Sequence, residues 1–337
     1  MSARQGQPVG LLGLGAYVPE RVMHNAEWSQ WVDTSDEWIR ERTGIETRRV
    51  AAPEQTTVDL AMEAAQVALA DAAVAPAGID EIIVATDTPE VYIPDTAAYV
   101  QERLGRLGGR EVPAYDLAGS GCAGFLQALD VARSRVLAGA AEHVLVIGVE
   151  LLTRLMNWRD RNTCVLFGDA AGAAVVGAGA GAAEIVAAVA GTDGTAAGVL
   201  ALEAGGTRVP FNEESAARGL HHAIAMNGRE VFKNAVRRMS QAGREVVARA
   251  GRTLDDVALL VPHQANQRIL DAVSRELGFG PERVYVNVHE YGNTGSASVP
   301  LALWEARRNG RVAPGDLVLL VSFGAGFHWA GVLLRYP

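Results

Sequence analysis

The feature that most constrains this chain is an internal repeat, in which four segments return in the same order. Each copy holds an apolar strand, a helix, a strand–turn–helix unit and a second apolar strand. In the first copy these are residues 79–84, 96–105, the unit around Cys122 and 142–147; in the second they are 254–261, 267–278, 284–298 and 316–321. The offset is roughly 170 to 175 residues throughout, which indicates a duplicated half.

Alternation of strands and helices along both copies predicts an α/β layer structure. A Gly- and Ala-rich stretch, 177–181, lies between the copies, so we divide the chain into an N-terminal half, 1–177, and a C-terminal half, 178–337. If the halves pack about a pseudo-twofold axis, their equivalent turns meet at the centre of the molecule. Cys122 then faces Asn293.

Cys122 lies where an apolar strand passes through a small-residue turn into a long amphipathic helix. A sulfur at a helix start is near the positive end of the helix dipole and near free N–H groups, which favour thiolate over thiol. This setting suits a nucleophile, and the alternative interpretation is a small core residue. The other cysteine, Cys164, lies in an apolar run and is predicted to pack in the core. Neither has a partner at CxxC spacing, so we expect no disulfide scaffold or metal site.

His263 comes directly after an apolar strand of the second copy, at the end where open α/β sheets keep their ligand sites. A neutral imidazole and the Asn293 carboxamide can both donate hydrogen bonds to one carbonyl oxygen and stabilise negative charge developing there. Taken singly, His263 could be a core histidine and Asn293 a turn residue beside Gly292. Together with Cys122 on a duplicated scaffold, they predict an active site.

Composition excludes several classes of protein. With 49% hydrophobic and 20% charged residues, the 337-residue chain can bury a large core, and nothing in it suggests disorder. Its apolar runs are too short to span a membrane and no apolar signal region follows the N-terminus, so we expect a cytoplasmic protein without membrane contact. The net charge of −9 argues against nucleic-acid binding, and an acidic partner would need a local basic patch.

Six short segments, in order along the chain, resemble those of β-ketoacyl-[acyl-carrier-protein] synthase III, in the thiolase-like superfamily. They are Asp33–Ile39 with Arg42–Ile45, Cys122–Phe125, Phe167–Asp169, Val261–Asn266, Gly292–Thr294 and Phe323–Phe327. The resemblance covers nearly the whole chain. It implies a thiolase-like five-layered αβαβα fold made of two duplicated halves, usually in a homodimer, which agrees with the internal repeat.

The resemblance implies a decarboxylating Claisen condensation that begins fatty acid synthesis. An acyl-CoA primer acylates Cys122, malonyl-[acyl-carrier protein] loses CO2, and its carbanion attacks the acyl thioester to give a 3-oxoacyl-[acyl-carrier protein]. His263 and Asn293 match the pair that stabilises the enolate, and the backbone N–H groups of Cys122 and Ala325 match a second oxyanion hole. No metal or redox cofactor is implied.

Three positions match the family's coenzyme A contacts. Trp38 and Arg161 correspond to its adenine clamp, and Arg42 corresponds to its phosphate contact. Trp38 itself follows a helix-start pattern and has arginines around it, which suits stacking of a base and binding of phosphate. The alternative interpretation of Trp38 is a side chain tucked under a surface helix with a solvated basic rim.

A basic docking face for the acidic carrier protein is also implied. Lys233, Arg268 and Arg275 lie on the two helices that match this face, and Arg237 and Arg244 nearby are as well explained as solvated surface charges.

The chain departs from the family pattern at several positions. One more residue than usual lies between Asp116 and Cys122, beside the proposed nucleophile. Arg229, Glu276 and Ala325 stand where members often have Asn, a basic residue and Gly. Ile93 matches an aromatic residue that in some members reaches across the dimer and caps the acyl pocket. Its smaller side chain predicts room for longer or branched primers.

Other functions stay open at this point. A synthase-III-like acyltransferase or ketosynthase of specialised metabolism would keep Cys122 but serve another acceptor or pathway, although the presence of both His263 and Asn293 favours decarboxylation. A non-catalytic subunit on the same fold is opposed by Cys122. A hydrolase using Cys and His lacks any sequence sign of a group that orients the His.

Overall fold

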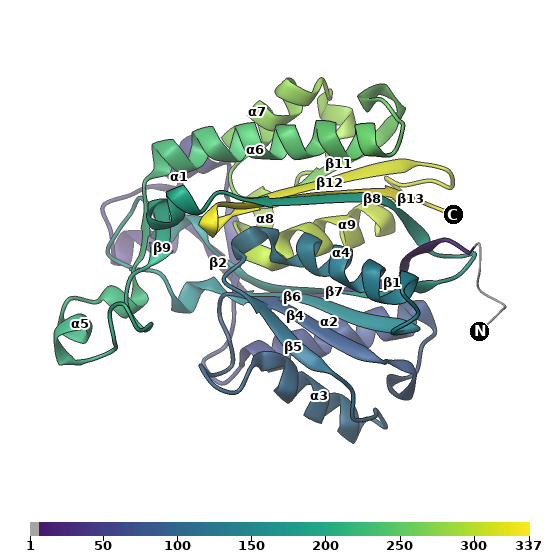
Figure 1. Ribbon diagram of the computed structural model, residues 1–337. Helices are drawn as coiled ribbons and strands as arrows, with labels where there is room; N and C mark the ends of the chain where they lie inside the picture. Colours follow the sequence, from purple (N-terminus) through teal and green to yellow (C-terminus); the bar gives the residue numbers. More distant parts are fainter. Residues whose placement is uncertain (1–6) are drawn as a thin grey trace.

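The computed structural model describes residues 7–337 and consists of five alternating layers of helices and sheets (Figure 1). Nine strands follow one hydrogen-bonded order that folds into two layers, called the two sheets below, which join where β8 pairs with β1. In spatial order they are β11 (Val257–Pro262), β12 (Leu317–Gly324), β13 (His328–Arg335), β8 (Ala183–Thr192), β1 (Val9–Tyr17), β7 (Asp169–Ala178), β6 (His143–Leu151), β4 (Glu81–Thr86) and β5 (Ala114–Ala118). The predicted layered α/β architecture is confirmed.

Two long helices form each helical layer. One outer layer holds α2 (Thr57–Ala72) and α3 (Thr96–Arg106), the central layer holds α4 (Gly124–Leu137) and α9 (Ser298–Arg308), and the other outer layer holds α6 (Gly228–Arg249) and α7 (Gln267–Leu277). The outer helix α7 buries one stripe, at Ile269, Leu270, Val273 and Leu277. The central helix α4 contacts strands of both sheets and buries a wider surface.

The two sheets meet at β1 and β8, which pair only through Gly10 with Glu184 and Leu11 with Ala183. The predicted boundary between residues 177 and 178 falls at the end of β7, and the Gly- and Ala-rich stretch runs on into the connection to β8, where Gly179 N–H donates to the Pro8 carbonyl oxygen. The central helices α4 and α9 pack between the two sheets and join them in one apolar core. The division into halves at residue 177 stays a prediction.

The strand predicted at 284–288 is wrong, because these residues pair with β11 at a single bridge, Val284 to Leu260. Beyond it, the backbone N–H groups of Asn287 and Val288 donate to the Gln264 side chain at 3.0 and 3.2 Å. A side-chain amide thus replaces the strand neighbour that would have continued the ladder. The short helix α8 (Val288–Tyr291) follows directly.

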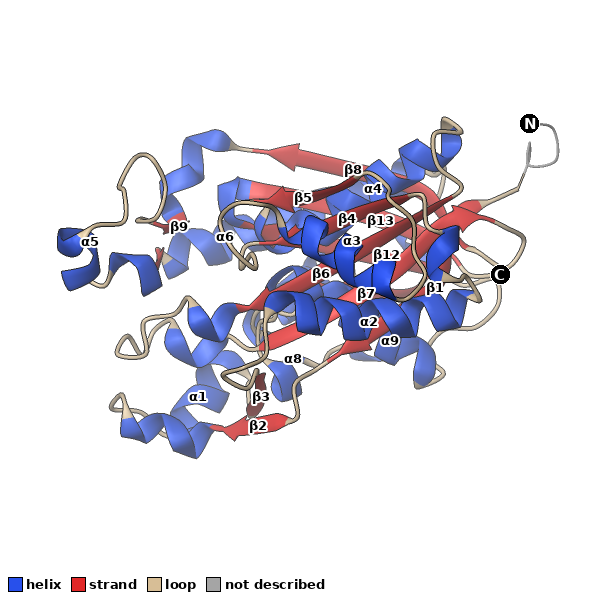
Figure 2. Ribbon diagram, turned by 90° about the horizontal axis from the view of Figure 1, so that it is seen from below, coloured by secondary structure: helices blue, strands red, loops and turns tan. Residues whose placement is uncertain are grey.

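Smaller elements surround one end of the sheets (Figure 2). The predicted helix start near residue 35 is confirmed, since α1 (Asp36–Thr43) begins with the Ser35 side chain accepting from Trp38 N–H. A ribbon of β2 (Arg21–His24) and β3 (Thr47–Val50) lies near α1, and a ribbon of β9 (Leu200–Leu202) and β10 (Ile224–Met226) lies near the protruding α5 (Glu213–Ala217). Within residues 7–337, every helix is too short or too polar to cross a membrane.

Candidate active site

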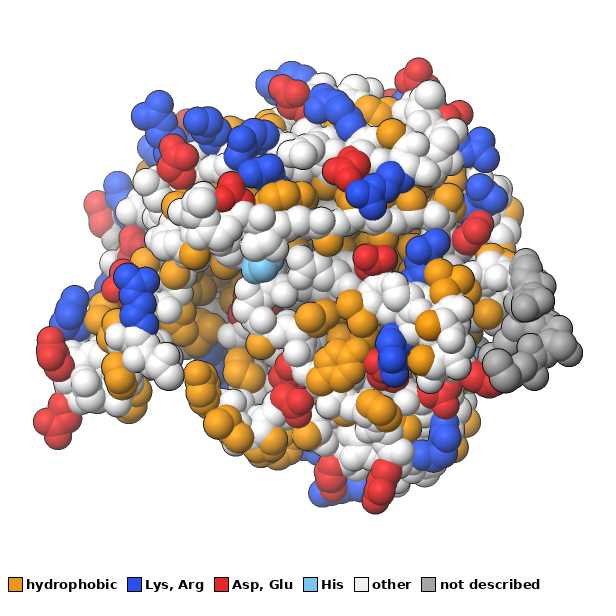
Figure 3. Space-filling model, viewed as in Figure 1, with side chains coloured by type: hydrophobic (Ala, Val, Ile, Leu, Met, Phe, Trp, Pro, Cys, Tyr) orange, Lys and Arg blue, Asp and Glu red, His pale blue; other side chains and the backbone are white. Residues whose placement is uncertain are grey.

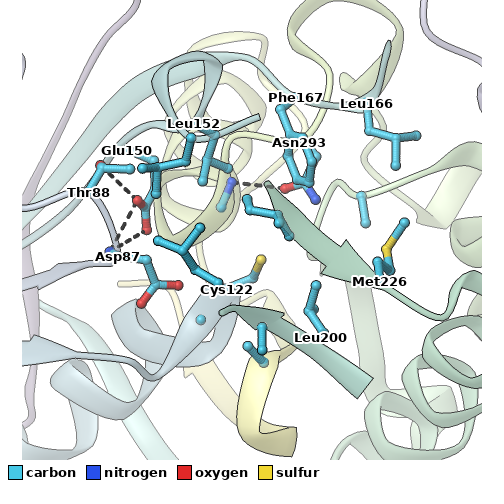
Figure 4. Close-up of a pocket in the computed structure, with 18 of the residues that line it drawn as sticks. Asp87, Thr88, Cys122, Glu150, Leu152, Leu166, Phe167, Leu200, Met226 and Asn293 are labelled. Atoms are coloured by element: carbon cyan, nitrogen blue, oxygen red, sulfur yellow. Dashed lines mark hydrogen bonds between the residues drawn. The ribbon is translucent and has the colours of Figure 1, made fainter. Parts of the chain in front are cut away.

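A cavity of about 1160 Å³ opens where strand ends of both halves meet, and Cys122, His263 and Asn293 all line it. Figure 4 shows the Cys122 sulfur and the Asn293 side chain near each other at this cavity. Since these residues come from different halves, the facing of equivalent turns expected from the repeat is observed.

The turn before Cys122 is held by close backbone contact with the other half. It leads into a single 3-10 turn, Gly121–Ala123, and then into α4. A Cβ added to Gly121 would lie 2.5 Å from the Ala325 nitrogen, and one added to Gly324 would lie 2.4 Å from the Cys122 nitrogen. Ser322 Oγ donates to the Cys122 carbonyl oxygen at 2.6 Å. Only glycines at these positions allow the two segments to approach this closely.

The helix-start setting that favours a Cys122 thiolate is opposed by the other surroundings of the sulfur. Burial raises the pKa of the Cys122 thiol well above its usual value, and the carboxyl groups of Asp87 and Glu150 raise it further. The helix start favours the anion, but desolvation and two nearby carboxyl groups outweigh it. The free protein therefore holds a protonated thiol, which must lose its proton during the reaction.

His263 is buried at the end of β11, where its backbone N–H donates to the Val321 carbonyl oxygen at 2.8 Å. Its ring Nδ1 lies 2.6 Å from Ser298 Oγ, so the contact with Ser298 uses Nδ1 and not Nε2. Burial lowers the pKa of His263 to about 3, so the imidazole is neutral near pH 7. Ser298 orients the His263 ring, and sequence reasoning missed it. The sequence shows Ser298 at the start of a helix, now α9, but not its contact with His263.

Asn293 has one end of its side chain fixed and the other end free. Its Oδ1 accepts a hydrogen bond from Gly295 N–H at 2.9 Å, which assigns the amide orientation and leaves Nδ2 as the donor. Its backbone N–H donates to the Leu166 carbonyl oxygen at 2.8 Å. The site thus holds a neutral imidazole and an amide N–H₂ on one cavity.

Two acidic residues on the same cavity, Asp87 and Glu150, were also missed by sequence reasoning. Asp87 directly follows β4, as His263 follows β11, and this shared position was the available signal. Burial is the main cause that raises the pKa of both carboxyl groups. Within the described part of the chain, no group of three His, Cys, Asp or Glu residues is placed to hold a metal ion.

Trp38 lines the cavity and has two arginines over its ring. The guanidinium carbons of Arg42 and Arg161 lie 4.8 and 4.9 Å from the centre of its ring system. Arg161 also donates to the Asp33 carbonyl oxygen at 2.8 Å. The ring is half-buried rather than tucked beneath α1, so it presents an aromatic face flanked by positive charge.

The basic residues predicted for docking lie on the outer layer formed by α6 and α7. Lys233, Arg268 and Arg275 are exposed, and Figure 3 shows Lys and Arg side chains gathered along this edge of the molecule. Arg244 instead pairs with Glu276 at 3.5 Å, which accounts for the acidic residue there. Arg268 also lines the cavity, and so does Arg229.

Ile93 does not line the cavity within this chain, and 81% of its surface is exposed. Its neighbours Val91 and Tyr92 do line it. The predicted contact of Ile93 with an acyl pocket is therefore not made inside one chain, and it stays a prediction for an assembly.

Comparison with known proteins gives the chain a family. Residues 115–194 match the family model described as 3-oxoacyl-[acyl-carrier-protein (ACP)] synthase III, and residues 247–336 match its C-terminal model. A β-ketoacyl-[acyl-carrier-protein] synthase III of Symbiobacterium thermophilum is 50% identical over 330 residues, which cover 98% of each chain.

Solved structures agree over the same length. The β-ketoacyl-[acyl-carrier-protein] synthase III of Thermus thermophilus is 48% identical, with a TM-score of 0.89 over 97% of this chain and 99% of that one. The priming β-ketosynthase of the R1128 polyketide pathway is 38% identical, with a TM-score of 0.88 over 98% of this chain and 97% of that one. The chain therefore belongs to the 3-oxoacyl-[acyl-carrier-protein] synthase III family, as the six sequence segments predicted.

Proposed function

We propose that Cys122, His263 and Asn293 are the residues with which this chain performs the condensation of its family. The chain is an acyltransferase that joins an acyl-CoA primer to malonyl-[acyl-carrier protein] and so begins fatty acid synthesis. The supporting observation is that one thiol from the N-terminal half and two neutral hydrogen-bond donors from the C-terminal half line a single cavity.

In the first half-reaction, the Cys122 sulfur attacks the carbonyl carbon of the acyl-CoA thioester. The backbone N–H groups of Cys122 and Ala325 are proposed to donate to the oxyanion of the tetrahedral intermediate. Their backbones lie close together because Gly121 and Gly324 leave no side chain between them. The carbon–sulfur bond to coenzyme A then breaks, and the coenzyme A thiolate takes up the proton that the Cys122 thiol lost.

In the second half-reaction, malonyl-[acyl-carrier protein] enters, and its thioester carbonyl accepts hydrogen bonds from His263 Nε2 and Asn293 Nδ2. Ser298 Oγ contacts both His263 Nδ1 and the Gln264 N–H, so its own proton can be donated to Nδ1, which leaves the ring proton on Nε2. Loss of CO2 leaves an enolate whose negative charge these two donors stabilise. Its carbon attacks the acyl-Cys122 thioester, and the Cys122 thiolate departs.

The neutral state of His263 supports this role. A histidine with a pKa of about 3 is a poor proton acceptor near pH 7 but keeps one N–H to donate. The chemistry assigned to these residues requires no metal or redox group, because breaking the carboxyl bond itself generates the carbanion.

Release of labelled CO2 from carboxyl-labelled malonyl-[acyl-carrier protein] tests this function. We expect CO2 release to require His263 and Asn293, and 3-oxoacyl product to require acyl-CoA and Cys122 in addition. A native enzyme that becomes acylated on Cys122 but releases no CO2 would contradict the proposal. It would identify an acyltransferase that serves another acceptor.

Coenzyme A binding is proposed at Trp38, Arg42 and Arg161. The half-buried indole offers a stacking surface for adenine, and the two exposed guanidinium groups offer positive charge to phosphate. In the free protein the two guanidinium carbons lie 4.8 and 4.9 Å from the centre of the ring, so both groups are close to a base stacked on the indole.

The partners and surroundings proposed for this chain follow from its surface. Lys233, Arg268 and Arg275 form a local basic patch on an otherwise acidic molecule, which suits the acidic carrier protein. We also propose a homodimer, because the exposed apolar loop at Tyr92 and Ile93 borders the cavity of its own chain. A cytoplasmic location is part of the same proposal.

A second candidate function is the priming of a specialised pathway. The observation in its favour is the 38% identity to the priming ketosynthase of the R1128 pathway, although identities of 48 and 50% to synthase III relatives favour primary metabolism. Acylation rates with acetyl-, isobutyryl- and longer acyl-CoA would separate the two. Strong preference for acetyl-CoA would contradict both this alternative and the wide pocket predicted from Ile93.

A further inference from the structure

Behind the Cys122 turn lie two carboxyl groups to which the reaction above assigns no role. Asp87 and Glu150 lie on the same side of Cys122 and both line the cavity (Figure 4). Glu150 is 1% exposed, and residues 7–337 place no Lys or Arg in an ion pair with it or with Asp87. Burying the Glu150 carboxyl group without a cation is costly, so a function that repays this cost is expected. Asp87 is partly buried and has His328 as a nearby basic group.

Glu150 is bonded to both neighbouring turns. Both of its carboxyl oxygens accept from Asp87 N–H at 3.2 Å, and Thr88 Oγ1 donates to Oε2 at 3.0 Å. On the opposite side, Oε1 lies 3.0 Å from the Ser296 hydroxyl. Ser296 belongs to the turn that carries Asn293, whereas Asp87 belongs to the first half. Glu150 therefore bridges the two halves.

The Ser296 contact indicates which group carries a proton. Ser296 Oγ also donates to the Ala85 carbonyl oxygen at 2.8 Å, and that oxygen can only accept. A hydroxyl has one proton, so a Ser296 that donates to Ala85 can only accept from Glu150. The contact is then a hydrogen bond only when Glu150 is protonated on Oε1.

Asp87 in turn holds the nucleophile turn. Its Oδ1 accepts from Gly119 N–H at 3.0 Å, and the Gly121 N–H also donates to the carboxyl group. Both glycines have positive φ, at +73° and +54°, so this turn relies on external bonds rather than on a regular strand or helix. The extra residue before Cys122 lies in this turn, and Asp87 supplies acceptors for the N–H groups of a longer loop.

We propose that Asp87 and Glu150 are positioning residues that set the Cys122 turn against the Asn293 turn. This proposal rests on the proposed function, since it assigns the two turns to successive half-reactions. Asp87 fixes the nucleophile turn alone, while Glu150 fixes Asp87 on one side and the Asn293 turn on the other. The two residues should therefore affect the half-reactions unequally.

The test measures the two half-reactions separately, as burst acylation by acyl-CoA and as CO2 release from malonyl-[acyl-carrier protein]. Loss of a few hydrogen bonds at such a site corresponds to about tenfold to a hundredfold in rate. We expect Glu150→Ala to slow both half-reactions by this amount, and Asp87→Ala to slow acylation by about tenfold with CO2 release nearly unchanged.

Glu150→Gln is the conservative variant, because an amide nitrogen at the Oε1 position can donate to Ser296 as the protonated acid does. We expect it to restore both rates to within about threefold of the native chain. Glu81→Gln is the matched control: Glu81 is equally buried, at the opposite end of β4, and its bonds to Tyr115 and Arg135 lie away from the cavity. It should lower thermal stability without changing either rate.

Three results would overturn the proposal. The first is that Glu150→Gln slows acylation and CO2 release as much as Glu150→Ala does. The second is equal slowing of both half-reactions by Asp87→Ala. The third is unchanged or faster acylation by Asp87→Ala, which would mean that this carboxyl group only raises the pKa of the thiol. Failure of the native enzyme to release CO2 would instead contradict the proposed function, so the two failures are distinguishable.

Discussion

The turns that lead into α4 and α9 have nearly the same backbone but different chemistry. Each has a single 3-10 turn that begins with a glycine at positive φ, Gly121 at +54° and Gly295 at +56°, and a central helix follows directly. Cys122 and Ser296 occupy equivalent places in these turns. The thiol is partly exposed at the cavity, whereas Ser296 is 1% exposed and bonded to Ala85.

The difference shows how a duplicated fold acquires an asymmetric site. Both copies place a small polar side chain at the start of a central helix, but only the first copy presents it to the cavity. The second copy presents Asn293 instead, from an earlier position in the turn. The strand ends differ in the same way, because β4 is followed by an acid, Asp87, and β11 by a neutral histidine, His263.

The largest effect is expected when Cys122 is removed, because this side chain gives the first turn its own chemistry. Cys122→Ala should lower product formation by at least about a thousandfold, because no other nucleophile occupies its place. Mass spectrometry of the enzyme after mixing with acyl-CoA should detect no covalent acyl group. Cys164→Ala is the control. Because Cys164 is fully buried and is not the residue acylated, this variant should become acylated as the native enzyme does. Acylation of the Cys122→Ala protein would contradict the assignment.

Removing the amide of the second turn should affect only the second half-reaction. Asn293→Ala is expected to slow CO2 release by on the order of a hundredfold to a thousandfold, the usual cost of one oxyanion donor. Burst acylation of Cys122 should stay within a few-fold of native, because that step uses backbone donors of the other oxyanion hole. Equal slowing of both steps would mean that Asn293 mainly supports the fold of the turn.

The contrast between the two strand ends predicts opposite responses of stability to pH. His263 has a pKa of about 3 when folded and 6.5 when unfolded, so the unfolded chain binds the extra proton and stability falls as pH drops below 6.5. Relative to His263→Asn, the native chain should lose about 2 kcal/mol between pH 7.5 and 5. Urea unfolding of both proteins measures this difference.

Asp87 provides the reverse case. Burial raises the pKa of its carboxyl group above 3.8, so its contribution to stability is present at low pH and is lost as pH rises through the folded pKa. Relative to Asp87→Asn, the native chain should therefore become less stable as pH rises in that window. Slopes of the same sign at the two strand ends would contradict the difference in their environments.

A smaller effect is expected at Ser298, which has a role only beside the second turn. Ser298→Ala removes the hydrogen bond to His263 Nδ1 and should slow CO2 release by about tenfold. Ser240→Ala is a matched control, because Ser240 is equally buried and its hydroxyl has no hydrogen-bond partner among residues 7–337. If both variants have native rates, the tautomer of His263 is set without Ser298.

The smallest effect concerns the outer helices of the two halves. Arg103 and Arg106 on α3 pair with Asp59 and Glu102, whereas Lys233 on α6 is in no ion pair within residues 7–337. Lys233→Glu should raise the KM for the carrier protein severalfold and reduce its dependence on salt, with kcat unchanged. Arg106→Glu should leave this KM unchanged. A severalfold rise in both variants would indicate that overall charge, rather than the α6 face, governs docking.

The internal repeat made much of the site predictable from sequence. Because duplicated halves bring equivalent turns together, Cys122, His263 and Asn293 could be assigned to one cavity from the order of the segments alone. The strand expected at 284–288 failed because a tertiary contact, the Gln264 side chain, satisfies N–H groups that a pattern of apolar residues assigns to a ladder.

The supporting contacts were beyond sequence reasoning for a different reason. Ser322 and Cys122 are separated by 200 positions, and Ser296 and Glu150 by 146, so each pair depends on the register between halves. The raised pKa of the thiol was beyond local sequence for the same reason, since burial is its main cause and the carboxyl groups that raise it further lie just after β4 and in β6 rather than in its own turn. Local sequence reports a helix start but not the charge placed opposite it.

The contact of Gly121 and Gly324 backbones has a consequence for engineering this enzyme. Since any side chain at either position would overlap the facing main chain, these two positions offer no room for redesign. Selection for new primers can act on other lining side chains, such as Leu152, Leu155 and Leu202, which lie on loops and short elements. A library directed to those three side chains therefore explores substrate range while leaving the chemistry intact.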